Sequence, residues 1–114
     1  MNTSDKMIAA ATIAAVNARI GDKSAETIKD ITRISILGKE CMTIDRIDKT
    51  VTLYGQTVCS KKSTRLMNAV LKAVTTATVK NNAGRWFLKR MPDGNWEEFT
   101  GTEATVDAKN ESML

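Results

Sequence analysis

The six consecutive residues Ser60-Lys61-Lys62-Ser63-Thr64-Arg65 are the stretch of this chain best suited to bind a ligand. Its three cationic and three hydroxyl side chains lie at the start of a segment with the amphipathic spacing of a helix. The N–H groups and dipole of a helix N-terminus favour an anion, so cations in the first turn are unfavourable by about 0.3–1 kcal/mol each. The stretch therefore indicates either a phosphate or carboxylate site or an ordinary solvated helix start, and both interpretations stay open.

A helix capped by Ser60 or Ser63 and running to about residue 78 would place cations on one side and apolar residues on the other. Leu66, Met67, Val70, Leu71 and Val74 form the apolar side, which we expect to face a core. Lys80 and Arg85 follow the helix and can extend the basic surface. The candidate nucleic-acid- or anion-binding residues are Lys61, Lys62, Ser63, Thr64, Arg65, Asn68, Lys72, Lys80 and Arg85.

Two aromatic residues beside this surface, Trp86 and Phe87, offer stacking faces of the kind that single-stranded nucleic-acid binders use. The chain has only five aromatic residues, however. Packing in a core or hairpin, together with Trp96 and Phe99, is therefore the favoured interpretation of Trp86.

Catalysis is not expected, because the chain contains no histidine and so lacks the commonest acid–base group. A cysteine nucleophile would have no imidazole partner. Asp45 and Asp48 are better interpreted as turn residues than as a catalytic or metal-binding pair. The spacings typical of phosphate-binding glycine loops and of zinc sites are missing. We expect no enzyme activity, no metal and no cofactor.

The net charge of +4 conceals three unequal parts of the chain. Residues 59–92 carry eight basic and no acidic residues, residues 1–58 are nearly neutral at +1, and residues 93–114 sum to −5. Such asymmetry bears on partners rather than on fold. It favours nucleic acid, either DNA or RNA, or an acidic protein surface as the partner of the basic segment.

Cys41 and Cys59 are predicted to be half-buried free thiols in a reducing compartment. The apolar run at residues 7–16 is too short to span a bilayer and is flanked by charges, so no membrane association is expected. We expect a cytoplasmic protein.

The alanine-rich segment at residues 5–20 predicts a helix capped by Thr3 or Ser4 and ended by Gly21. Its core stripe would be Ala9, Ile13, Val16 and Ile20. A second face of small residues, Met7, Ala11, Ala14 and Ala18, allows close packing against another helix, either within the monomer or in a homodimer.

The middle of the chain predicts a short helix at residues 24–30, capped by Ser24, and then a strand at residues 32–37. A single helix over residues 25–37 is the alternative. Alternating apolar residues predict a β-hairpin that pairs 41–47 with 50–54, and residues 56–59 can extend its second strand past Gly55.

A loop is expected at residues 81–84, followed by a hairpin of residues 85–91 and 96–99 around Pro92-Asp93-Gly94-Asn95. Lys89 and Arg90 would then lie opposite Glu98 and Glu97. Residues 101–114 read as a disordered acidic tail. The predicted fold is α+β in one domain over residues 1–100: an N-terminal helix, a small antiparallel sheet on one central amphipathic helix, and a C-terminal hairpin.

A short apolar strand, then Ser60…Ser63-Thr64-Arg65, then a helix with Asn68, resembles a segment of small orphan proteins encoded by bacteriophages. The resemblance covers residues 42–74 and implies function by binding, either to nucleic acid or to a host enzyme or defence complex that is inhibited. It transfers no individual functional residue.

These observations lead to three hypotheses of function. The first is a non-catalytic module that contacts nucleic-acid phosphates through the basic helix face. The second is a protein-binding inhibitor or adaptor that docks on a host protein. The third is a structural protein that dimerises through its first helix.

Overall fold

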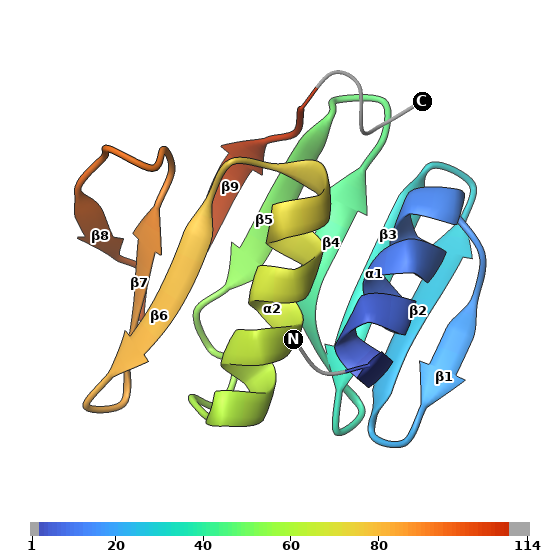
Figure 1. The fold of residues 1–114 in the computed structure, drawn as a ribbon, viewed down its shortest axis with the longest axis horizontal. Coiled ribbons are helices and arrows are strands. Elements are labelled where there is room, and N and C mark those ends of the chain that lie inside the picture. The colour runs from blue at the N-terminus through green and yellow to red at the C-terminus, as the bar shows by residue number, and fades with distance from the viewer. Residues whose placement is uncertain (1–2, 110–114) are drawn as a thin grey trace.

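The computed structural model describes residues 3–109 and shows an α+β fold with two helices and two antiparallel sheets in that range (Figure 1). The helices α1 (Thr3–Ala14) and α2 (Lys61–Val74) lie side by side over one face of the larger sheet. That sheet has six strands in the order β1 (Ala18–Ile20), β2 (Lys23–Ile28), β3 (Ile31–Ile36), β4 (Lys39–Asp45), β5 (Thr50–Tyr54) and β9 (Glu103–Asp107). The smaller sheet is β6 (Thr78–Asn82), β7 (Arg85–Lys89) and β8 (Trp96–Glu98).

The core fills the space between the helices and the six-stranded sheet. Successive side chains of a strand point to opposite faces, so every second residue points toward the helices. The inward positions are apolar and buried, and they meet the apolar stripe of α2. The buried sheet residues include Ala25, Ile34, Ile36, Met42, Ile44, Val51, Leu53, Ala104 and Val106. The opposite face is polar, as is usual for an antiparallel sheet with one solvated side, and carries the hydroxyl pairs Thr43–Tyr54 and Thr52–Thr105.

The predicted N-terminal helix is present but shorter than expected. It ends at Ala14, Ala15 adopts a left-handed backbone (φ 56°), and residues 18–20 form β1 against β2. Asp5, Ile8, Ala9, Ala11 and Thr12 are buried, whereas Ile13 and Val16 are about half exposed (50% and 52%). Of the predicted core stripe, Ala9 is buried and Ile20 packs against the core from β1, whereas the prediction is wrong for Ile13, on the solvent side of α1, and for Val16, beyond the end of the helix.

The predicted short helix at residues 24–30 is also wrong, since Ser24 lies within β2 rather than at a helix cap. β2 pairs with both β1 and β3, and these ladder bonds outweigh the local capping preference of a serine. The strand predicted at residues 32–37 is confirmed by β3, so the alternative single helix is wrong.

The hairpin predicted from residues 41–54 is confirmed by β4 and β5. Asp45 accepts hydrogen bonds from the backbone N–H groups of Ile47 and Asp48, which is the turn role expected for it. Residues 56–59 do not extend β5. Cys41 is the extra residue of a β-bulge opposite Ile34 and Ser35, and burial raises the pKa of its thiol to about 12.

The hairpin predicted around residues 92–95 is confirmed by the pairing of β7 with β8. It is not the last element, however, and β6 adds a third strand where the sequence suggested a loop at residues 81–82. Both predicted free thiols are confirmed, although Cys41 is fully buried and only Cys59 is partly exposed.

The predicted disordered tail is wrong for residues 103–107, which form β9 at the edge of the six-stranded sheet. Ala104 and Val106 are the inward residues of this strand, and their alternation with Glu103, Thr105 and Asp107 is the period-2 pattern of a half-buried strand. Residues 110–114 lie outside the described part of the chain.

The two sheets meet at Gly55 and Trp86. Gly55 donates to the Thr102 carbonyl (2.7 Å), and a Cβ at Gly55 would lie only 1.9 Å from the Phe99 carbonyl oxygen. The Trp86 indole stacks on Phe99 with 6.1 Å between ring centroids and donates to the Thr57 carbonyl (2.8 Å). Trp86 therefore belongs to the core, as the favoured interpretation held.

Candidate functional site

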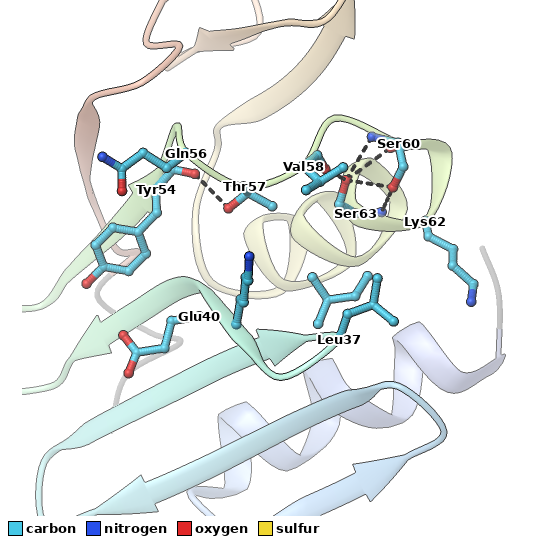
Figure 2. Close-up of a pocket in the computed structure, with 11 residues that line it drawn as sticks. Leu37, Glu40, Tyr54, Gln56, Thr57, Val58, Ser60, Lys62 and Ser63 are labelled. Atoms are coloured by element: carbon cyan, nitrogen blue, oxygen red, sulfur yellow. Dashed lines mark hydrogen bonds between the residues drawn. The ribbon is translucent and has the colours of Figure 1, made fainter.

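The start of α2 is a closed capping box. Ser60 accepts from the Ser63 backbone N–H (3.0 Å), and the Ser60 N–H donates to the Ser63 hydroxyl (3.1 Å). The buried Ser63 hydroxyl also donates to the Val58 carbonyl (2.7 Å) (Figure 2). The Thr64 hydroxyl donates to the Ser60 carbonyl (2.7 Å). These hydroxyls begin the helix, so of the predicted site residues Ser63 and Thr64 have structural roles here.

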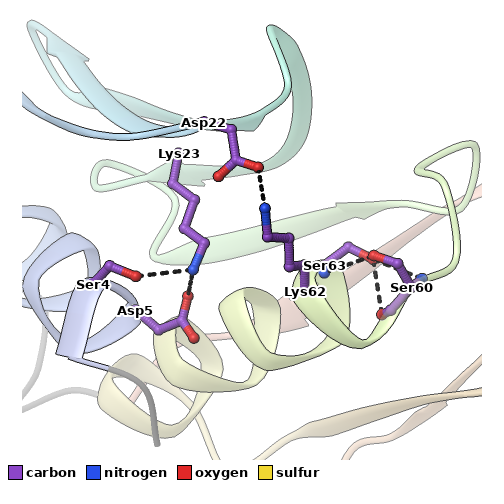
Figure 3. A network of polar contacts seen from close by, with 7 residues as sticks. All are labelled: Ser4, Asp5, Asp22, Lys23, Ser60, Lys62 and Ser63. Atoms are coloured by element: carbon purple, nitrogen blue, oxygen red, sulfur yellow. Dashed lines mark hydrogen bonds and ion pairs between the residues drawn. The ribbon is translucent and has the colours of Figure 1, made fainter.

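Lys62 is held by an acid from another element. Its ammonium lies 2.7 Å from Asp22 in the turn between β1 and β2, and this hydrogen bond keeps the pKa of the Asp22 carboxyl below its usual value (Figure 3). Lys23, which follows Asp22 in the sequence, is buried, and its ammonium lies 2.6 Å from the buried Asp5 carboxylate of α1. The two neighbouring pairs tie the turn to both helices.

Asn68 is a connector between α2 and β6. Its side-chain amide donates to the Val79 carbonyl (2.9 Å) and accepts from the Val79 N–H (2.8 Å). Asn81, two residues further along β6, donates to Thr64 and to the Ser60 carbonyl. The predicted site residue Asn68 therefore holds the small sheet against the helix, where its hydrogen-bonding groups are already used.

Three predicted cations remain on the solvent side of α2: Lys61, Arg65 and Lys72, which we call the α2 stripe. All three are exposed, and no acidic residue within residues 3–109 forms an ion pair with them. At 100° per residue they fall within about 40° of one another around the helix, and they span about 16 Å along it. This is the part of the predicted site that the structure keeps together.

The outer face of the three-stranded sheet holds the other predicted cations, Lys80 and Arg85. Arg85 lies 3.6 Å from Glu98 of β8, and on the same hairpin Arg90 lies 2.9 Å from Glu97. Lys80 instead lies over the Trp96 ring, 4.2 Å from its centroid, and Lys89 lies 5.0 Å from the same centroid.

The expected pairing of Arg90 with Glu97 is thus confirmed, whereas Lys89 faces Trp96 rather than Glu98. The reason is the register, which sets Phe87 opposite Glu98 and Lys89 opposite Trp96. Trp96 is the residue that sequence reasoning assigned to packing and that the structure leaves 38% exposed. A register counted outward from a two-residue Asp93-Gly94 turn sets Lys89 opposite Glu98, and the longer connection at residues 90–95 shifts the observed pairing by two residues.

A cavity of about 690 Å³ lies between the β3–β4 turn and the loop that leads into α2 (Figure 2). Leu37 and Val58 border it and are 70% and 68% exposed, and its polar lining includes Lys39, Glu40, Gln56, Ser60, Lys62 and Ser63. The sequence analysis did not predict this cavity, because Leu37 and Val58 are far apart in the sequence and only the fold brings them together.

The site holds cations and hydroxyls but no group of metal-ligating residues: within residues 3–109, no three His, Cys, Asp or Glu side chains cluster. Burial raises the pKa of the Cys59 thiol, which therefore stays protonated and weakly nucleophilic near neutrality. Neither α1 nor α2 is long and apolar enough to cross a membrane.

Comparison of this chain with protein-family models, with curated proteins and with solved structures found no match.

Proposed function

We propose that this protein is a non-catalytic binding module that contacts nucleic-acid phosphates through the α2 stripe, Lys61, Arg65 and Lys72. The observation that carries the proposal is their lack of acidic partners within residues 3–109, while Lys23, Lys62, Arg85 and Arg90 are all neutralised by acids of the fold. Unpaired cations on one rigid element are well placed to neutralise a row of phosphates.

The test is fluorescence anisotropy with labelled duplex and single-stranded probes at low salt. The wild type should bind, and the variant Lys61→Gln/Arg65→Gln/Lys72→Gln should lose most of its affinity. Lys62→Gln is the matched control, because it removes a cation from the same helix turn that is already paired with Asp22. Absence of any association at low salt would reject the proposal.

A second candidate function, a protein-binding inhibitor or adaptor, is favoured by the cavity rimmed by Leu37 and Val58. Apolar side chains exposed beside charged ones are typical of protein interfaces. Affinity capture from a lysate with and without nuclease separates the two functions. Partners that persist after nuclease treatment and disappear with Leu37→Asp/Val58→Asp would support the protein-binding function, whereas partners lost with nuclease would support the first.

The third hypothesis, a dimer formed through α1, is tested by light scattering. Part of the small-residue face is already used, since Ala11 is buried and α1 packs against α2. The exposed residue Ala14 is the remaining probe position. A change of mass with Ala14→Trp would support a dimer, and a monomeric wild type would reject it.

A further inference from the structure

The outer face of the three-stranded sheet gathers aromatic and basic side chains from all three strands. Because alternate residues of a strand share a face, the observed register places Lys80 of β6, Phe87 and Lys89 of β7, and Trp96 of β8 together. The other face of this sheet holds the buried residues Val79, Trp86 and Leu88. The two tryptophans therefore have opposite roles, with Trp86 in the core and Trp96 facing solvent.

The charges on this face are crowded around one ring. The Lys80 and Lys89 ammonium groups lie 4.2 Å and 5.0 Å from the Trp96 centroid, and Lys80 is also 5.8 Å from the Phe87 centroid. Neither lysine forms an ion pair with an acid of residues 3–109, since Glu98 of the same face pairs with Arg85. Two like charges beside one ring repel each other, and an anion bound between them would relieve that repulsion.

The two lysines beside an exposed indole favour one class of anionic partner over the others. An acidic peptide would pair with the two ammonium groups but leave the exposed indole without a specific role. Duplex nucleic acid presents phosphates, but its base faces are stacked within the helix. A single strand offers a phosphate for the lysines and a free base face for the ring, and stacking of bases on aromatic side chains is its usual mode of recognition.

The outer face of the three-stranded sheet leads to the α2 stripe. Thr78 lies on the same face of β6 as Lys80, and it borders a cavity of about 330 Å³ that is also lined by Lys72 and Lys109. A single-stranded nucleic acid bound at Trp96 therefore has a path along β6 toward Lys72. Flexible lysine stems allow both ammonium groups to leave the ring face for a phosphate when a base occupies it.

We propose that the outer sheet face binds single-stranded nucleic acid, with one base stacked on Trp96 and the adjoining phosphates held by Lys80 and Lys89. This inference rests on the proposed function and specifies its ligand class. Lys80 was expected at the site from its charge alone, whereas Trp96 and Lys89 were not.

The chain contains two tryptophans, and because Trp86 is buried, quenching of the intrinsic fluorescence by an added ligand reports on Trp96. The probe is an unlabelled oligothymidylate of about 16 nucleotides, the upper end of the site sizes of single-strand-binding folds. Quenching should saturate with the affinity measured by anisotropy. Trp96→Phe should abolish the quenching and keep most of the binding, because a phenyl ring still stacks.

Trp96→Ala should weaken binding of the single strand by about 5- to 150-fold, the range for loss of one stacked base, and change duplex binding much less. Ile47→Ala is the control, because it removes an exposed apolar side chain from the β4–β5 turn instead. Thermal unfolding of each variant shows that the fold is retained, and Trp96→Phe keeps the experiment decisive if the alanine variant unfolds.

Binding by anisotropy without tryptophan quenching would overturn the inference and leave the proposed function standing. An equal loss of single-strand and duplex affinity in Trp96→Ala would do the same. Saturable quenching by polyglutamate at comparable affinity would assign the face to an acidic protein instead. Failure of the wild type to bind either nucleic-acid probe would overturn both proposals together.

Discussion

The α2 stripe and the outer face of the three-stranded sheet are both basic, but they hold their cations differently. On α2, Lys61, Arg65 and Lys72 stand apart from acids and rings within residues 3–109. On the sheet, Arg85 is neutralised by Glu98, and Lys80 and Lys89 share Trp96. The helix therefore offers point charges suited to phosphates, and the sheet offers an aromatic surface flanked by charge.

The difference shows that the number of basic residues in a segment overstates the number of cations that are free to bind an anion. The segment at residues 59–92 has eight basic residues and no acid. Three of them, Lys62, Arg85 and Arg90, are paired with acids that lie outside the segment. Two of these acids, Glu97 and Glu98, arrive on β8 and one, Asp22, on the β1–β2 turn.

The largest expected effect separates the two faces of the small sheet. Trp86→Ala should lower the free energy of unfolding by about 3–5 kcal/mol, because it empties the contact with Phe99 and leaves the Thr57 carbonyl without its donor. Trp96→Ala should lower it by only about 1–2 kcal/mol, the value of two cation–π contacts near solvent. Urea denaturation measures both, and equal losses would contradict the division into a core face and a binding face.

A buried cation and an exposed cation of the α2 stripe should differ in their effect on stability. Lys23→Ala leaves Asp5 as a buried charge without its cation, and we expect a loss of about 3 kcal/mol or more. Arg65→Ala should change stability by no more than about 0.5 kcal/mol, since it removes an exposed side chain with no ion pair in the described range. Thermal unfolding tests this, and a large loss for Arg65→Ala would make the stripe part of the scaffold.

The smallest expected effect concerns the neighbours Lys61 and Lys62. The pKa of Asp22 is lowered by its bond to Lys62, so this carboxylate stabilises the fold above its unfolded pKa of about 4, and the contribution is lost as the pH falls through the lower folded value. Lys62→Gln should therefore lower the melting temperature slightly near neutrality and lose that difference in acid.

Lys61→Gln is the matched control for this experiment and should show no such pH-dependent difference. A melting profile of Lys62→Gln that runs parallel to the wild type throughout the acid range would show that the pair contributes nothing.

The elements with strong local patterns were predictable from the sequence. The capping residue Ser60 and the apolar stripe from Leu66 to Val74 predicted α2 to within a few residues at its end, and alternation predicted the β4–β5 hairpin. The failures have a common physical cause. β1, β2 and β9 form because a neighbouring strand pairs with them. The alanine-rich run that leads into residues 18–20 and the acids Glu103 and Asp107 conceal that pairing in the sequence.

The candidate site was predictable in part for a similar reason. Cations at helical spacing identified Lys61, Arg65 and Lys72, since this depends only on the period of the helix. The partners that neutralise Lys62 and Arg85 come from strands and turns whose positions follow from tertiary pairing. The role of Asn68 depends on β6 lying beside α2, which no local pattern indicates.

The most direct test of the central claim is the salt dependence of nucleic-acid binding. For single strands, each phosphate contact contributes about 0.7 to the slope of log K against log salt concentration. Replacing Lys61, Arg65 and Lys72 by glutamine should therefore reduce the magnitude of that slope by about 2, while Lys62→Gln should leave it nearly unchanged. A slope that is the same in the triple variant and the wild type would contradict the account.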